Sequence, residues 1–267
     1  MVLEAILNPK KAEDKPWTVL VISIIFSMTA IFLSYTLFPS QASILSVAFV
    51  TIFFVPFFQR LFTYEEKKDE EIAAKKIKKS DNIFKRHQRV IFVYGAFFLG
   101  IIIVYSFVFT FFPFMKEVFS LQMDWFKGFV TSEADFAKYF FNNTQVMMIF
   151  FVLSVIFGAG AVFILSWNAS IIAVYLGMVV NKFIPALGVS TAYVYGFTVG
   201  ISSIILHAIP EIGGYFFAGI AGGILSVALI RERFMSKEFK EVGKDAMVWL
   251  ILAEFLIIAG AAIEAVL

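Results

Sequence analysis

The chain has 267 residues, of which 60% are hydrophobic and 16% are charged, and its formal net charge is +2. A soluble domain carries about a quarter charged residues to solvate its surface, so this composition excludes a soluble globular protein, and the small net charge excludes a nucleic-acid-binding one. The absence of cysteine excludes disulfides, thiolate metal sites and cysteine nucleophiles. The sequence therefore predicts an all-α, polytopic transmembrane helix bundle with about seven crossings.

The first elements are a polar segment, two apolar spans and a charged run. Residues 1–16 predict a cytoplasmic amphipathic segment in the headgroup layer. Residues 17–62 contain the first two transmembrane helices, the second of which carries Pro56 as a potential kink. Residues 63–89 form a charged cytoplasmic helical loop, which we interpret as a solvated stalk that includes His87. A docking surface for a cytoplasmic partner or anionic lipid is the alternative interpretation of this loop.

Residues 90–141 contain the third transmembrane helix and an outer interfacial loop. The loop is rich in aromatic residues at near-helical spacing, which predicts interfacial helices on the outer surface. Ser132 resembles the N-terminal cap of the helix that follows, with Asp135 as an acid in the first turn of that helix.

Residues 142–267 form a glycine- and alanine-rich transmembrane core. Its apolar segments are Val146–Trp167, Ser170–Ile184, Thr191–Ile209, Ile212–Ile230 and Ala246–Leu267. Of the 22 lysines and arginines in the chain, 18 precede the first span or fall within Arg60–Arg89 or Arg231–Lys244. The positive-inside rule places these three basic segments in the cytoplasm. An odd number of crossings must then join the outer loop to Arg231, so the four segments between them cannot all cross.

The simplest solution joins Thr191–Ile209 and Ile212–Ile230 into one net crossing, with a broken or re-entrant helix near Pro210. Irregular backbone at membrane depth is tolerated only where protein or water surrounds it, so we expect this break inside the bundle. The resulting topology is that of a multi-pass protein of the cell membrane, with a cytoplasmic N-terminus and an outer C-terminus.

Polar residues in this apolar half predict a buried polar cluster. Its expected members are His207, Glu211, Glu254, Asn143 and Asn168. A charge at mid-bilayer costs about 2.5–3.5 kcal/mol on insertion scales, so an acid there is seldom without a partner. Glu254 is expected near His207 and Glu211, whereas Glu264 should approach the outer interface. Interhelical hydrogen bonds that lock the bundle, an ion or proton path, and a catalytic role all remain open.

Glycines at four-residue spacing predict close helix packing. They are Gly196, Gly200, Gly219 and Gly223. Packing within the monomer and packing between copies both fit this spacing. The sequence contains no His-Glu-x-x-His run and no Gly-x-Ser-x-Gly elbow. We therefore predict no catalytic residues, no metal, no cofactor and no enzymatic activity.

The C-terminal half resembles a known family. The resemblance covers roughly Phe136–Leu267 and rests on Phe140-Phe141-Asn142-Asn143, Asn168, His207-Ala208-Ile209-Pro210-Glu211 and Ala261-Ala262-Ile263-Glu264. These motifs are similar to those of the stage II sporulation protein M family, and the opening LNPKKAEDKPW is similar to archaeal members. Ala169 and Ala208 depart from it, because the family usually has glycine there.

This resemblance implies a non-enzymatic scaffold or organiser of a membrane- or envelope-remodelling complex. The namesake bacterial member acts in a membrane complex with peptidoglycan-degrading partners and is not itself the hydrolase. Expected partners are the lipid bilayer, further copies of the chain, and other membrane or cytoplasmic proteins. The alternative is a channel or transporter for ions, protons or lipid that uses the buried polar cluster. An intramembrane enzyme is the second alternative.

Overall fold

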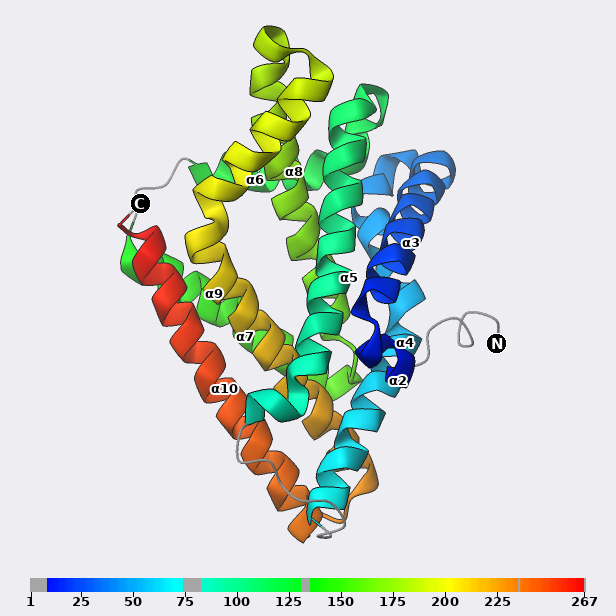
Figure 1. Cartoon of the computed structure of the whole chain (residues 1–267), viewed down its shortest axis with the longest axis vertical. Coiled ribbons are helices and arrows are strands. Elements are labelled where there is room, and N and C mark those ends of the chain that lie inside the picture. Colours follow the sequence, from blue (N-terminus) through cyan, green and yellow to red (C-terminus); the bar gives the residue numbers. More distant parts are fainter. Residues whose placement is uncertain (1–8, 74–82, 131–134, 235, 267) are drawn as a thin grey trace.

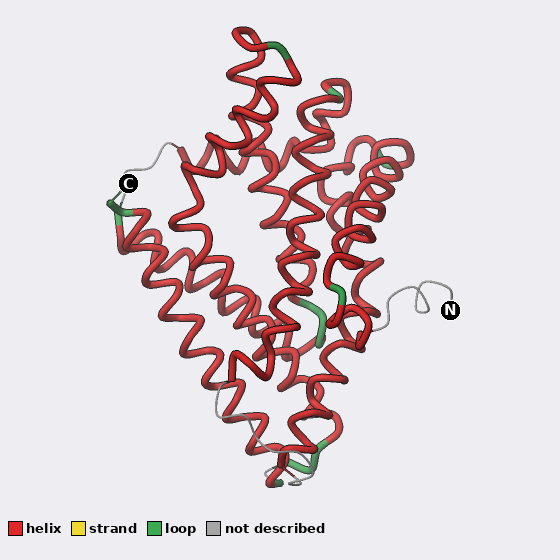
Figure 2. Tube along the Cα trace, in the orientation of Figure 1, coloured by secondary structure: helices red, strands yellow, loops and turns green. Residues whose placement is uncertain are grey.

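The computed structural model describes residues 9–73, 83–130, 135–234 and 236–266. Its helices are α2 (Pro9–Asp14), α3 (Pro16–Leu37), α4 (Ala42–Ala73), α5 (Ile83–Phe111), α6 (Ser120–Val130), α7 (Phe136–Phe157), α8 (Ala161–Leu187), α9 (Val189–Arg231) and α10 (Lys237–Glu264), with short 3-10 helices η1 (Pro39–Gln41) and η2 (Pro113–Phe119). Within these described residues the regular structure is entirely helical (Figures 1 and 2). Seven of the described helices, namely α3, α4, α5, α7, α8, α9 and α10, are long and apolar enough to cross a membrane. The predicted all-α, polytopic bundle is confirmed.

The helices form two groups that meet along α8. In Figure 1, α3 and α4 lie on the side of the N-terminus, and α7 and α10 lie on the side of the C-terminus. Between them, α8 packs against both α5 and α9. The end of α4 and the start of α10 come together at the lower end of the view. Each long helix satisfies its own backbone hydrogen bonds, which is the condition for a chain that crosses hydrocarbon.

The predicted helix break near Pro210 is wrong. The two apolar segments on either side of this proline belong to one helix, α9, of 43 residues. Proline removes a single backbone hydrogen bond and its ring presses on the preceding turn, which bends a helix without ending it when neighbours hold both halves. Figure 1 shows this as a change in the direction of α9 partway along its length. A full break would leave more backbone groups unpaired within the bundle.

The predicted span Val146–Trp167 is also wrong. Gly158 has a φ of +63°, a left-handed conformation suited to glycine, and it ends α7. Three residues later α8 begins at Ala161. At its other end α7 starts at Phe136, where Asp135 accepts a hydrogen bond from the backbone N–H of Ala137 at 3.1 Å. The expected boundary between residues 141 and 142 therefore falls inside a helix.

The outer loop is helical, as predicted, and its helices η2 and α6 each expose one face and bury the other against the bundle. Val118, Phe119 and Gln122 are completely buried. Ser43 of α4 donates a hydrogen bond to Gln122 Oε1 at 2.7 Å, and Gln122 Nε2 donates to Ser170 Oγ of α8 at 3.0 Å. This glutamine ties α6 to two transmembrane helices.

The expectation that the stalk is solvated is wrong for two residues near its ends. Glu65 near the end of α4 and His87 near the start of α5 are 0% and 1% exposed. They face each other, and the Trp249 ring of α10 lies edge-on to the His87 ring. The middle of the predicted stalk, residues 74–82, lies outside the described residues, as do residues 1–8 of the predicted amphipathic segment.

Candidate functional site

A cavity of about 470 Å³ lies among α7, α8 and α9, with contributions from α6 and the last residue of α10. Isoleucines of α8 and α9 form much of its wall. They are Ile164, Ile171, Ile172, Ile204 and Ile212. The polar side chains that reach the cavity include Asn142, Asn143, Asn168, Ser203, His207, Glu211 and Glu264. Most of the predicted polar residues are therefore brought to one place by three consecutive helices.

Asn143 is the centre of the hydrogen-bond network in this cavity. Its Nδ2 donates to Glu211 Oε1 at 2.8 Å, and its Oδ1 accepts from the Tyr215 hydroxyl at 3.1 Å. Asn142 Nδ2 also donates to Asn143 Oδ1 at 3.1 Å. Asn143 is 7% exposed and Tyr215 is 5% exposed, so these bonds lie in the protein interior. The amide thus connects α7 to α9 while presenting the Glu211 carboxyl to the cavity.

Glu264 is a member of the site that the sequence reasoning placed elsewhere. Its side chain lines the same cavity as Glu211. Gly260 makes room for this arrangement, because a Cβ there would lie 2.6 Å from Glu211 Cγ. Gly260 and Glu264 are four residues apart and so share one face of α10. That spacing was the signal available in the sequence.

Glu254 does not line the cavity. Thr144 Oγ1 donates to Glu254 Oε1 at 3.1 Å, so the carboxyl connects α10 to α7 instead. Asn168 does line the cavity, but its Nδ2 donates to the Ile164 carbonyl of its own helix at 2.9 Å. Two residues of the predicted cluster therefore stand outside the network around Asn143.

His207 faces the cavity from α9, one helical turn before Glu211. Its Nδ1 is buried and forms no hydrogen bond with any described residue. The ring thus lines the same cavity as the two carboxyl groups, with one nitrogen unused. α9 continues as one helix through Pro210, so this proline does not end the helix at the site.

The predicted packing glycines have different environments. A Cβ at Gly196 would lie 2.6 Å from Val180 Cα, and one at Gly200 would lie 2.8 Å from Leu176 Cδ2, so both sit where α9 crosses α8. A Cβ at Gly223 would meet the Phe62 ring at 2.6 Å. At Gly219 the nearest atom would be 3.5 Å away, an ordinary contact. At Gly222 α9 approaches α7 closely, because a Cβ there would lie 2.5 Å from the Phe151 carbonyl oxygen.

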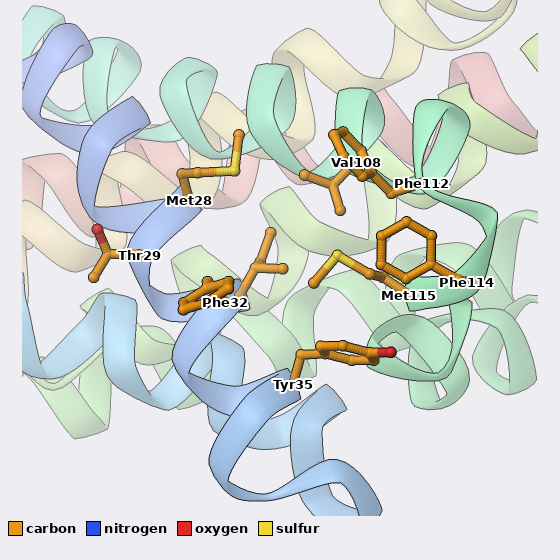
Figure 3. A pocket seen from close by; sticks show the side chains of 9 residues that line it. Met28, Thr29, Phe32, Tyr35, Val108, Phe112, Phe114 and Met115 are labelled. Atoms are coloured by element: carbon orange, nitrogen blue, oxygen red, sulfur yellow. The ribbon is translucent and has the colours of Figure 1, made fainter.

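A second cavity, of about 460 Å³, lies between α3 and the segment formed by α5 and η2 (Figure 3). Met28 and Phe32 of α3 face Phe112, Phe114 and Met115 across it (Figure 3). The hydroxyl of Thr29 on its rim already donates to the Ile25 carbonyl at 2.9 Å. This cavity is a hydrocarbon-lined pocket and offers no charged group for ligand chemistry.

The fold and the first cavity define the protein as a polytopic helical membrane protein with a polar site enclosed by apolar helices. The sequence model of the stage II sporulation protein M family matches residues 96–267, and the chain belongs to this family. The match begins within α5, earlier than the resemblance near Phe136 indicated, and it includes every residue that lines the polar cavity. Comparisons with curated proteins and with solved structures give no significant match.

Proposed function

We propose that this member of the family is a non-enzymatic scaffold of a membrane- or envelope-remodelling complex. The observation that carries the proposal is the close packing of α9 in the segment that follows Glu211. Every residue from Gly214 to Ile224 is buried. Gly222 and Gly223 leave no space beside Phe151 and Phe62, as the distances above show. A bundle packed in this way is suited to holding partners at fixed positions and poorly suited to passing a solute along α9.

The hydrogen bonds of the polar cluster favour the same function. Asn143 uses both ends of its amide on other residues, and Thr144 bonds Glu254 on a third helix. Such interhelical bonds add about 0.6 kcal/mol each on average in a membrane bundle. Together they join α7, α9 and α10 into one unit, which favours a structural role for these groups over a catalytic one.

Transport is the second candidate, and the polar cavity itself is the observation that favours it. His207, Glu211 and Glu264 are ionisable groups that face one space between transmembrane helices. Groups of this kind mark ion and proton pathways in many transporters. The two candidates differ in whether a solute crosses the bilayer through the protein.

A flux measurement separates the two functions. The purified full chain would be reconstituted in sealed vesicles and tested for proton and potassium flux, with protein-free vesicles and the Glu254→Gln variant as controls. Under the scaffold function the wild-type chain gives no flux above that of protein-free vesicles. A flux that is lost in Glu211→Gln and kept in Glu254→Gln would overturn the scaffold proposal and establish transport.

A scaffold must also be found in a larger assembly. Chemical crosslinking in the native membrane, at the natural expression level, should shift most of the chain into a complex larger than one or two copies. Glu211→Gln should leave that complex intact, because the substitution keeps the shape of the side chain. A chain that stays monomeric under these conditions would contradict the proposal.

A further inference from the structure

We propose that the polar cavity binds an organic cation with an alkyl body and no phosphate, which is the chemistry of an alkylammonium ligand. This inference concerns a small-molecule site and does not depend on whether the protein is a scaffold. It rests on the charge of the cavity, the nature of its wall, and one unpartnered buried nitrogen.

The charge of the cavity favours a cation. Glu211 and Glu264 bring two carboxyl groups into one cavity, and no lysine or arginine is among the lining residues. Two carboxyl groups can bond to each other only when one of them keeps a proton. An ammonium group placed between them supplies N–H donors to both and allows both to ionise. A phosphate-bearing headgroup would add negative charge with no cation to neutralise it.

The wall of the cavity favours an organic cation over a metal ion. Five isoleucines line it, and the ring of Trp167 and the phenol of Tyr215 also face it. Calcium and magnesium require six or more oxygen ligands, or retained waters, around the ion. Aliphatic walls instead stabilise an alkyl chain, and aromatic faces attract an ammonium group. A volume of about 470 Å³ lies within the range of small-molecule sites.

His207 adds an independent indication of a missing partner. Its side chain is half-buried, with Nδ1 shielded from solvent, and within the described residues this nitrogen has no hydrogen-bond partner. Neutral imidazole carries one acceptor nitrogen, so an N–H group of the ligand can bond to it one turn from Glu211. Polar groups buried in this way are normally satisfied, and an exception calls for a specific partner.

The cavity is also accessible. Trp125 on its rim is 40% exposed, and the lining residues Asn142 and Ser203 are exposed as well. A ligand can therefore enter beside α6 with its charged end directed towards the carboxyl groups.

The test measures binding of hexylammonium to the full chain in nanodiscs of zwitterionic lipid at pH 7, by calorimetry, after subtraction of protein-free discs. Hexanol and hexanoate serve as neutral and anionic probes of equal length, and ethylammonium as the short amine. We expect saturable binding of one hexylammonium per chain. Each of the other three probes should bind at least tenfold more weakly. Absence of saturable binding, or equal binding of hexanol, would overturn the proposal.

Substitutions locate the binding site. Glu211→Gln and Glu264→Gln should each weaken hexylammonium binding at least tenfold. Glu254→Gln is the matched control, because it changes an acid of α10 that lies outside the cavity, and it should alter binding less than twofold. If Glu211→Gln fails to fold, Glu264→Gln alone decides, since Glu264 is the last residue of α10. Equal weakening by Glu254→Gln and Glu264→Gln would show that the site is elsewhere.

Discussion

The imidazole Nδ1 of His87 lies 2.7 Å from the Glu65 carboxylate Oε2, although 22 positions separate the two residues in the sequence. Both side chains are 1% exposed. The contact joins the end of α4 to the start of α5, and the Trp249 ring of α10 lies against the histidine with ring centroids 5.7 Å apart. This buried pair therefore joins α4 to α5 at the charged end of the bundle, in contact with α10.

We predict that His87→Ala lowers the free energy of unfolding by about 3–5 kcal/mol, because it removes the imidazole that bonds a buried carboxyl group. Reversible unfolding in mixed micelles, followed by circular dichroism, measures the change. The control is Arg89→Ala, which removes an ion pair to Asp14 whose side chains are 55% and 51% exposed. That substitution should cost less than about 1 kcal/mol. Equal losses in both variants would show that the buried pair adds no special stability.

Glycine substitutions test the close approach of α9 to its neighbours. Gly222→Ala should destabilise the bundle by about 1–3 kcal/mol, because its Cβ would overlap the Phe151 carbonyl of α7. Gly219→Ala in the same helix meets no atom closer than 3.5 Å, and alanine favours helix by up to about 1 kcal/mol over glycine. Thermal unfolding should therefore show a lower midpoint for Gly222→Ala and an unchanged or higher one for Gly219→Ala. The reverse order would contradict the helix arrangement described above.

Asn143 and Asn168, two of the three asparagines that line the cavity, should differ in their effect on stability. Asn143→Ala removes bonds to Glu211 and Tyr215, so we expect a loss of about 1–2 kcal/mol. Asn168→Ala removes a bond within its own helix and should cost less than about 0.5 kcal/mol. The same mixed-micelle unfolding measures both variants. A larger loss for Asn168→Ala would mean that the network is centred elsewhere.

Membrane orientation stays a prediction that the cysteine-free chain makes easy to test. Single cysteines at Lys138 and Lys237 report on opposite ends of the bundle. Both lysines are exposed, and neither caps a helix, in contrast to Asp135 and Ser236. An impermeant thiol reagent added to intact cells should label Lys138→Cys, which the charge distribution places outside. Labelling of Lys237→Cys from outside would reverse the predicted topology.

The sequence predicted that the two apolar segments around Pro210 make one crossing with a break between them, and the structure contradicts only the break. The distribution of basic residues required that the two apolar segments around Pro210 count as one crossing, and they do belong to one helix. The prediction of a break was wrong because it took only the proline into account and not the helices that pack against α9. The neighbours of α9 on both sides of the bend, such as Val180 of α8 near Gly196 and Ile257 of α10 near Gly214, hold the two halves in one helix.

The sequence by itself determined the class of the protein, the number of long apolar helices and the residues that carry polarity into the bundle. These properties follow from the composition and from the spacing of apolar residues along a single helix, so they do not depend on how the helices pack together. Only the tertiary structure decided which polar residues meet. Glu264 lines the same cavity as Glu211, Glu254 accepts a hydrogen bond from Thr144, and Glu65 lies within hydrogen-bond distance of His87. The partner of a polar side chain depends on the rotation and axial register of two separate helices. Packing across the bundle sets both, since a turn of helix moves a side chain by about 5.4 Å along the axis.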